Sequence, residues 1–231
     1  MIRGLIFDFD GLILDTEVPI FRSWQEIFAE HGCTMTVHDW ADYLGRSPDS
    51  FDPCDKLEAC LGRPVDRDAL HARQRAREQE LIESEEVLPG VVDRLQEAKR
   101  MGLRLAVASS SPRSWVHGHL SRLGLLDEFD CVRCGDEVRE AKPAPDLFLA
   151  ALSCLGLKPE EAIVFEDAPH GITAAKRAGI FCVAVPNALT KTLSFDHADL
   201  KLNSLAELSL AELLSHVEEK IRFKHERGEG A

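Results

Sequence analysis

The segment that constrains the fold most is the run Leu5–Gly11, in which apolar residues lead into two aspartates and a glycine. Asp8 and Asp10 are two residues apart, so on an extended strand their side chains point the same way. Two carboxylates held together repel each other, which destabilises a fold unless a cation or a proton offsets the repulsion. A divalent cation does so and leaves one carboxylate free to act as a nucleophile. The run therefore predicts a buried strand that ends in a reactive site.

Short apolar runs alternate with helical patterns along most of the chain, which is typical of a parallel sheet with crossover helices. The predicted strands are rich in Ile, Val, Leu and Phe, as expected when both faces of a sheet are covered: Leu5–Phe9, Leu103–Ala108, Ala162–Phe165 and Ile180–Val185. The helices predicted between them are Val91–Met101, Pro112–Leu123 with Ser111 as its N-cap, Asp146–Leu155 and Ile172–Ala178. The predicted fold class is α/β.

Residues 16–86 show a different pattern, without a predicted strand. Aromatic residues recur at helical spacing from Phe21 to His31, and we expect them to pack in a core. A loop rich in glycine and proline follows, and then a charged helix over Asp66–Ser84. We therefore expect an all-helical insert between the first strand and the rest of the sheet. From about Phe223 the chain is charged and contains glycine, which predicts a frayed or disordered tail.

The charge and hydropathy of the chain exclude several kinds of partner. A formal net charge of −13 argues against a nucleic-acid polymer as partner and against docking on an anionic membrane. The longest apolar runs are far shorter than the roughly 20 residues of a membrane-spanning helix. The aspartates at positions 8 and 10 interrupt the apolar start, so it does not read as a signal peptide.

The seven cysteines are scattered and show no disulfide framework. Cys131 and Cys134 form a C-x-x-C pair, but no second pair or histidine cluster completes a zinc site. We interpret them as buried thiols, and the chain as a protein of the reducing cytoplasm.

Four segments that follow predicted strands each supply residues suited to phosphoryl transfer. In open α/β sheets, ligands bind at the carboxyl ends of the strands, so we expect these segments to meet. The segments are Asp8 with Asp10, Ser109-Ser110-Ser111, Lys142, and Glu166-Asp167. Each has a plainer reading taken alone: the serines as a helix cap, the lysine as a solvated side chain, the acidic pair as another cap. Their coincidence at four places favours a common site that binds phosphate and Mg²⁺.

In order and spacing, the motifs resemble the haloacid dehalogenase superfamily, and within it the β-phosphoglucomutase-like phosphatases. The matching stretches are Asp8–Thr16, Ala108–Ser111, Lys142–Phe148 and Phe165–Ile172. The resemblance covers nearly all of the chain up to about Leu214. It implies a Rossmann-like catalytic core from residues 1–15 and 87–215, with helices on both faces, and a mobile helical cap from residues 16–86 inserted into it. Residues 216–231 would then form the end of the last helix and the tail.

The resemblance also implies a role for each residue of the four segments. Asp8 would attack the phosphorus to form an aspartyl-phosphate, and Asp10 would protonate the leaving oxygen and then deprotonate the hydrolytic water. The phosphoryl oxygens would be held by Ser109, Ser110 and Lys142. Mg²⁺ would be the cofactor, bound by the Asp8 side chain, the Asp10 backbone carbonyl and Asp167, with Glu166 close by.

Several family reactions remain open. The dehalogenases and phosphonatases of this superfamily lack an aspartate at the position of Asp10, so its presence favours phosphate esters. A phosphoglucomutase carries a histidine where this chain has Ile20, and an arginine where it has Pro48. These differences favour a phosphatase over a mutase. A catalytically silent binding protein remains a remote alternative, because no catalytic residue is missing.

The expected substrate is a small phosphorylated metabolite, such as a sugar phosphate or a nucleotide. Within the predicted loop over residues 45–50, Arg46 and Ser47 are the candidate residues that select it, although each could equally belong to a polar turn. We expect the protein to act as a monomer.

Overall fold

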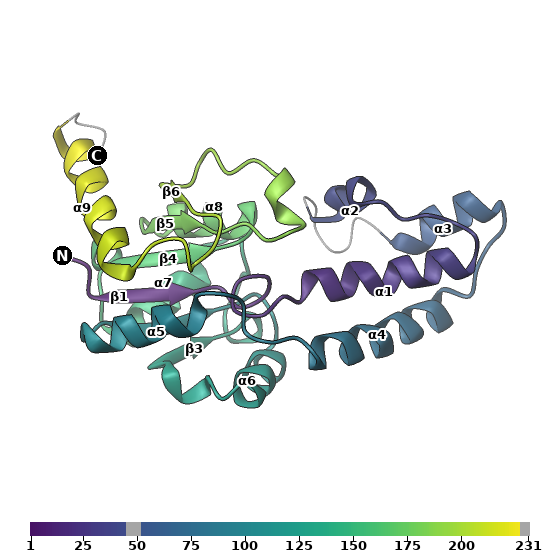
Figure 1. Ribbon diagram of the computed structural model, residues 1–231, viewed down its shortest axis with the longest axis horizontal. Helices are drawn as coiled ribbons and strands as arrows, with labels where there is room; N and C mark the ends of the chain where they lie inside the picture. The colour runs from purple at the N-terminus through teal and green to yellow at the C-terminus, as the bar shows by residue number, and fades with distance from the viewer. Residues whose placement is uncertain (45–51, 227–231) are drawn as a thin grey trace.

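The computed structural model describes the fold of residues 1–44 and 52–226 (Figure 1). Its strands form one six-stranded parallel sheet in the order β3-β2-β1-β4-β5-β6. The bounds are β1 Gly4–Phe7, β2 Arg104–Ala108, β3 Cys131–Arg133, β4 Ala162–Glu166, β5 Phe181–Ala184 and β6 Leu200–Lys201. The predicted α/β class and all four predicted strands are confirmed. The strands β3 and β6 were not predicted, because three and two residues are too few to show a pattern.

Helices cover both faces of the sheet, and residues of β1 alternate between the two cores (Figure 1). Leu5 and Phe7 pack with α5, α6 and α9, whereas Ile6 packs with α7 and α8. The helix bounds are α5 Val91–Arg100, α6 Arg113–Arg122, α7 Asp146–Leu155, α8 Pro169–Arg177 and α9 Leu210–Glu226. The layered core that was expected is therefore present.

Four helices form the insert at the carboxyl end of β1, to one side of the sheet (Figure 1). They are α1 Glu17–Glu30, α2 Val37–Leu44, α3 Pro53–Leu61 and α4 Arg67–Glu83. Their core contains the predicted aromatic stripe, with Phe21, Trp24 and Phe28 all buried. An isolated bridge joins Leu14 to Val87, where the chain leaves the sheet region and returns. The predicted boundaries between the catalytic core and the helical cap, at residues 15/16 and 86/87, lie beside this bridge.

The segment after α1 is more helical than predicted, because α2 and α3 lie where we expected only a loop. Pro53 was interpreted as a loop residue, but it occupies the first turn of α3, where proline is favoured. The Asp52 carboxylate caps this helix by accepting the Cys54 N–H at 2.9 Å. Before α2, the Thr36 hydroxyl and the Asp39 carboxylate each accept the other's backbone N–H. These caps were the missed signals.

The sequence analysis predicted no disulfide, and this prediction is wrong. Cys33 is bonded to Cys60 within the insert, and Cys131 is bonded to Cys154 rather than facing Cys134 as a thiol. The partners are 27 and 23 residues apart in sequence, a spacing that carries no recognisable pattern. The fold brings their Cα atoms to 6.3 and 6.4 Å, which is within the range that a disulfide spans.

One smaller expectation also changes. The helix α9 continues to Glu226, beyond the predicted start of a frayed tail at Phe223, and residues 227–231 lie outside the described part. None of the helices described by the structure combines the length and the apolar character needed to cross a membrane.

Candidate active site

The carboxyl ends of the three central strands carry the predicted catalytic residues. Phe7 of β1 is in register with Val107 of β2 on one side and Phe165 of β4 on the other. Asp8 directly follows β1, Ser109 directly follows β2, and Glu166 is the last residue of β4. Adjacent parallel strands in register place these side chains at one edge of the sheet.

Lys142 reaches this edge from the loop before α7. Its Nζ lies 2.5 Å from Asp8 Oδ1 and 2.6 Å from Glu166 Oε1. Burial alone would lower the pKa of this ammonium, but the two carboxylates outweigh burial and raise the pKa instead. Lys142 is therefore a buried cation clamped between two acids, and not a solvated lysine.

Three buried carboxylates surround this cation. Asp8, Glu166 and Asp167 each offer an oxygen, and these oxygens all lie within 4.8 Å of one another. Burial, and then repulsion from Glu166, raises the pKa of Asp8 to about 8. Burial, and then Glu17, also raises the pKa of Asp167 well above its usual value. One lysine cannot neutralise three carboxylates, and hard oxygen ligands of this kind suit Mg²⁺. The residues present therefore fit the expected ion.

Two glycines allow the carboxylates to come so close. Gly11 has a φ of +75°, and a Cβ there would lie 2.4 Å from Asp167 Oδ2. A Cβ on Gly171, in the first turn of α8, would lie 1.8 Å from Glu166 Oε1. A side chain at either position would displace a candidate metal ligand.

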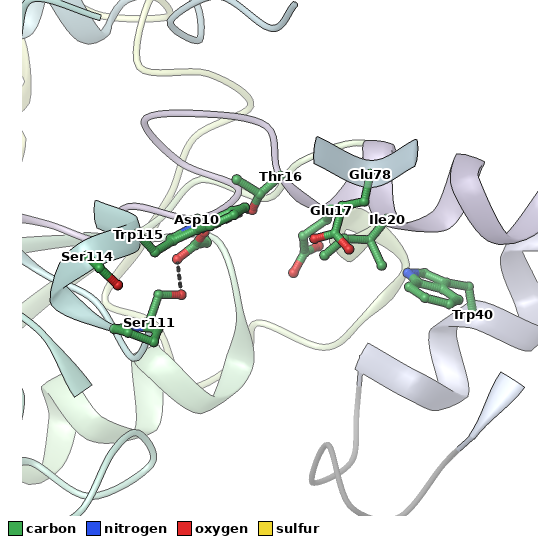
Figure 2. Close-up of a pocket in the computed structure, with 10 residues that line it drawn as sticks. Asp10, Thr16, Glu17, Ile20, Trp40, Glu78, Ser111, Ser114 and Trp115 are labelled. Atoms are coloured by element: carbon green, nitrogen blue, oxygen red, sulfur yellow. Dashed lines mark hydrogen bonds between the residues drawn. The ribbon is translucent and has the colours of Figure 1, made fainter. Parts of the chain in front are cut away.

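Asp10 is held by several hydrogen-bond donors. Within the described residues, its Oδ1 accepts hydrogen bonds from Thr16 Oγ1 at 3.1 Å and from Trp115 Nε1 at 2.9 Å. Its Oδ2 accepts a hydrogen bond from Ser109 Oγ at 3.1 Å. The same oxygen accepts one from Ser111 Oγ at 2.7 Å (Figure 2). Ser111 was predicted as the N-cap of the next helix. That helix begins instead at Arg113 after Pro112, and the Ser111 hydroxyl turns to Asp10.

Two cavities meet at Asp10. One, of about 430 Å³, is lined by Asp8, Ser110, Lys142, Glu166 and Asp167 and contains the candidate metal and phosphate ligands. The other, of about 620 Å³, opens toward the helical insert and is lined by residues of both parts of the molecule (Figure 2). Asp10, Glu17 and Ser111 line both cavities. Asp10 thus lies at the junction of the two cavities.

Some residues of the site escaped the sequence analysis. Asn187 Nδ2 donates to Asp167 Oδ2 at 2.8 Å and to Glu17 Oε2 at 3.2 Å, and so connects α1 to the acidic cluster. Asn187 follows β5, so the same strand-end reasoning could have found it. Trp115 had no such signal, because its contact with Asp10 depends on the direction of α6. The candidates Arg46 and Ser47 lie outside the described residues.

Comparison with known proteins identifies the class to which this fold and site belong. The family model for haloacid dehalogenase-like hydrolases matches residues 5–185. The chain therefore belongs to the haloacid dehalogenase-like hydrolase family, as its motifs predicted.

Individual relatives narrow this class. YhcW of Bacillus subtilis (strain 168), a presumed phosphatase by name, is 45% identical over 217 residues, which cover 94% of this chain and 98% of YhcW. Fructose-1-phosphate phosphatase YqaB of Escherichia coli (strain K12) is 36% identical, over 79% of this chain and 95% of its own length. By this homology the chain is a phosphoric monoester hydrolase of the family.

The fold of the chain is also similar to that of a solved structure. A variant of CbbY from Rhodobacter sphaeroides, crystallised with xylulose 1,5-bisphosphate, superimposes with a TM-score of 0.70 at 31% identity. The match covers 91% of this chain and 98% of CbbY.

Proposed function

We propose that the chain is a Mg²⁺-dependent phosphatase that hydrolyses a small phosphorylated metabolite through a phosphorylated Asp8. The observation that carries this proposal is the position of Asp10 between the two cavities. A phosphoryl group at Asp8 and its leaving group in the larger cavity would have Asp10 at their junction. That is where a general acid must lie.

In the proposed first step, a carboxylate oxygen of Asp8 attacks phosphorus and the ester oxygen leaves. Lys142 holds the nucleophile and would offer its ammonium to the incoming phosphoryl oxygens. The hydroxyl groups of Ser109 and Ser110, which follow β2, would supply further donors. Mg²⁺ held by Asp8, Asp167 and the Asp10 carbonyl, with Glu166 alongside, would neutralise the charge on the nucleophile and the phosphate.

Asp10 carries the proton in both steps. It gives a proton to the leaving oxygen, and then takes one from the water that attacks the phosphorylated Asp8. An oxygen that carries a proton accepts fewer hydrogen bonds, so a protonated Asp10 must release at least one of its donors. We infer that the protonated Asp10 releases a serine hydroxyl, Ser109 or Ser111, and keeps its bond to Trp115.

The lining of the larger cavity favours a hydroxyl-rich leaving group. Glu17 of α1 and Glu78 of α4 present carboxylates that can accept hydrogen bonds from sugar hydroxyls. Trp40 and Trp115 add flat apolar surface to the same cavity. Among its described lining residues none is a lysine or an arginine that would hold a second phosphate. We therefore propose a sugar or polyol monophosphate as the substrate.

The same cavity disfavours the mutase alternative. Ile20 lies in its wall, at the position where the related mutases carry a histidine, and an alkyl side chain cannot transfer a proton. A mutase must also retain a bisphosphate intermediate, and the described wall of this cavity offers no lysine or arginine to its second phosphate.

The test is Mg²⁺-dependent release of inorganic phosphate from a panel of phosphate esters. The panel contains hexose and pentose monophosphates, nucleoside monophosphates, xylulose 1,5-bisphosphate, and β-glucose 1-phosphate with glucose 1,6-bisphosphate. We expect release from sugar monophosphates, abolished by Asp8→Asn and unchanged in the surface control Asp127→Asn. Conversion to glucose 6-phosphate without free phosphate would identify a mutase instead, and no turnover of any ester would favour the silent protein.

The expected setting is the cytoplasm, and the expected state is a monomer. The two disulfides argue against a reducing compartment, because cytosolic thiols are normally kept reduced. Thiol titration of protein purified without reductant separates the cases: three free thiols if both disulfides form, and seven if neither does.

A further inference from the structure

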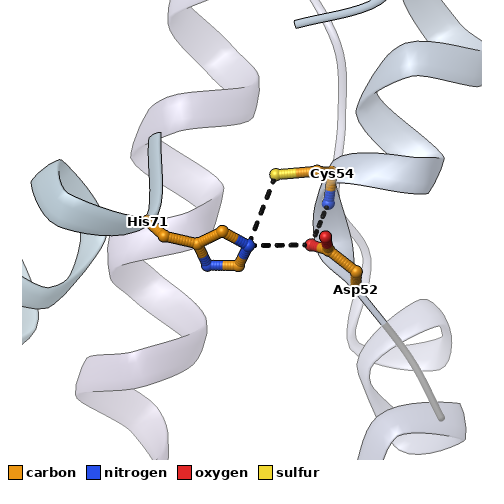
Figure 3. Close-up of side chains that lie close together, drawn as sticks. All are labelled: Asp52, Cys54 and His71. Atoms are coloured by element: carbon orange, nitrogen blue, oxygen red, sulfur yellow. Dashed lines mark hydrogen bonds and ion pairs between the residues drawn. The ribbon is translucent and has the colours of Figure 1, made fainter. Parts of the chain in front are cut away.

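Away from the catalytic cavities, the helical insert brings together three side chains that the proposed reaction does not use (Figure 3). Asp52 and Cys54 lie at the start of α3, and His71 lies on α4. His71 Nε2 is 3.1 Å from Asp52 Oδ1 and 3.8 Å from Cys54 Sγ. All three ligand atoms lie within 4.8 Å of one another.

We propose that Asp52, Cys54 and His71 form a second metal site, which binds Zn²⁺ with three protein ligands and a water molecule. Tetrahedral Zn²⁺ with Zn–N of about 2.0 Å, Zn–S of about 2.3 Å and Zn–O of about 2.0 Å places N about 3.5 Å from S and about 3.3 Å from O. The observed separations of 3.8 and 3.1 Å require shifts of only about 0.3 Å.

The donor set selects the ion. One thiolate, one imidazole and one carboxylate form a mixed set of N, O and S ligands, which suits Zn²⁺ far better than Mg²⁺ or Ca²⁺. Two negative ligands would balance the charge of the ion. The catalytic cluster is different, because its candidate ligands are all oxygen.

The surroundings hold two of the ligands in place without blocking them. Arg67 Nη1 bonds Asp52 Oδ2 at 3.0 Å, which leaves Oδ1 directed at His71. The Cys54 N–H bonds Oδ1 at 2.9 Å and fixes the start of α3. The His71 ring meets the Trp24 ring edge to face, with centroids 5.2 Å apart. Partners of this kind orient metal ligands and strengthen binding.

Zn²⁺ at this site would connect the start of α3 to α4. Cys54 is fully buried and His71 is half-buried, so the ion would lie at the edge of that core. Binding to the folded state alone stabilises a protein. The site would therefore raise the stability of the insert without entering the phosphatase reaction.

Cobalt titration of the full-length protein tests the site. The protein is stripped with chelator, kept free of reductant so that the disulfides persist, and given excess Mg²⁺ to occupy the catalytic cluster. We expect one equivalent of Co²⁺ to produce a thiolate-to-metal charge-transfer band, which a carboxylate site cannot give. Zn²⁺ should then displace the cobalt and abolish the band.

Variants show whether these residues are the ligands. His71→Ala should abolish the band, or weaken Co²⁺ binding at least tenfold, with the fold intact by circular dichroism. Cys54→Ser should abolish the band as well. Cys134→Ala removes a different buried free thiol and should leave the band unchanged. No thiolate band in the folded wild type, or a band that survives in Cys54→Ser or His71→Ala, would overturn the proposal.

Discussion

Replacing Lys142 with methionine tests the charge balance on which the active site depends. The methionine keeps most of the unbranched stem but removes the ammonium between Asp8 and Glu166. Three buried carboxylates would then face one another without a cation. We expect the variant to be folded but strongly destabilised when no divalent ion is present.

The magnitude follows from the burial of this pair. Lys142 and Glu166 have side chains only 7% and 1% exposed, and removing one partner from a buried ion pair costs about 3–5 kcal/mol. Protonation of the neighbouring carboxylates limits this loss of stability, because each unit by which their pKa can rise corresponds to about 1.4 kcal/mol. A divalent ion would stabilise both proteins, and each tenfold by which it binds the variant more tightly returns about 1.4 kcal/mol of the loss. We therefore expect a loss of about 3 kcal/mol or more in chelator, and of less than half that in saturating Mg²⁺.

Urea unfolding at pH 7, with chelator and with Mg²⁺, measures both quantities. The control is Lys99→Met, which removes a surface ion pair with Glu128 and should cost at most about 1 kcal/mol in either buffer. Wild-type stability of Lys142→Met in chelator would refute the reasoning. Equal stabilisation of both proteins by Mg²⁺ would refute it too, because the ion would then not neutralise the same carboxylates as Lys142.

Three further predictions concern the same site. Trp115→Phe removes one donor to Asp10 and should lower kcat roughly tenfold with little change in KM, as steady-state kinetics would show; an unchanged kcat would exclude a positioning role. Gly171→Ala introduces a methyl group that would clash with the Glu166 carboxylate, and it should raise the Mg²⁺ concentration for half-maximal activity at least tenfold. An unaltered Mg²⁺ dependence would show that Glu166 does not help to bind the metal. Burial raises the pKa of Asp8 from 3.8 to about 8, so the folded state keeps a proton that the unfolded chain releases. Without divalent ions, stability should therefore fall as the pH rises between about 4 and 8, and a stability that rises over this range would contradict that assignment.

The sequence was most informative where the local pattern and the tertiary structure agree. Apart from Arg104 at the start of β2 and Glu166 at the end of β4, the strands β1, β2, β4 and β5 are buried apolar runs that can be recognised alone. The helix α7 was predicted with its bounds, because Asp146 starts an apolar periodic segment that Gly156 ends. The rule that ligands bind at the carboxyl ends of parallel strands then brought distant residues together.

The parts of the fold and of the site that the sequence analysis missed depend on tertiary contacts, which no local sequence pattern encodes. Trp115 meets Asp10 only because α6 packs beside the end of β1, and the bonded cysteines are neighbours only in the folded chain. The starts of α2 and α3 were visible as capping residues, but their proline and threonine also suit a loop. The pairing of Asp52 with His71 requires α3 and α4 to face each other.

The central claim is that Asp8 becomes covalently phosphorylated during turnover. The direct test is a rapid-quench single turnover of a sugar monophosphate with Mg²⁺, followed by mass spectrometry of the acid-quenched peptides. The account predicts one phosphoryl group on Asp8 that forms before free phosphate appears, and none in Asp8→Asn. Free phosphate released in the first turnover without a phosphorylated Asp8, or a phosphoryl group on another residue, would contradict it.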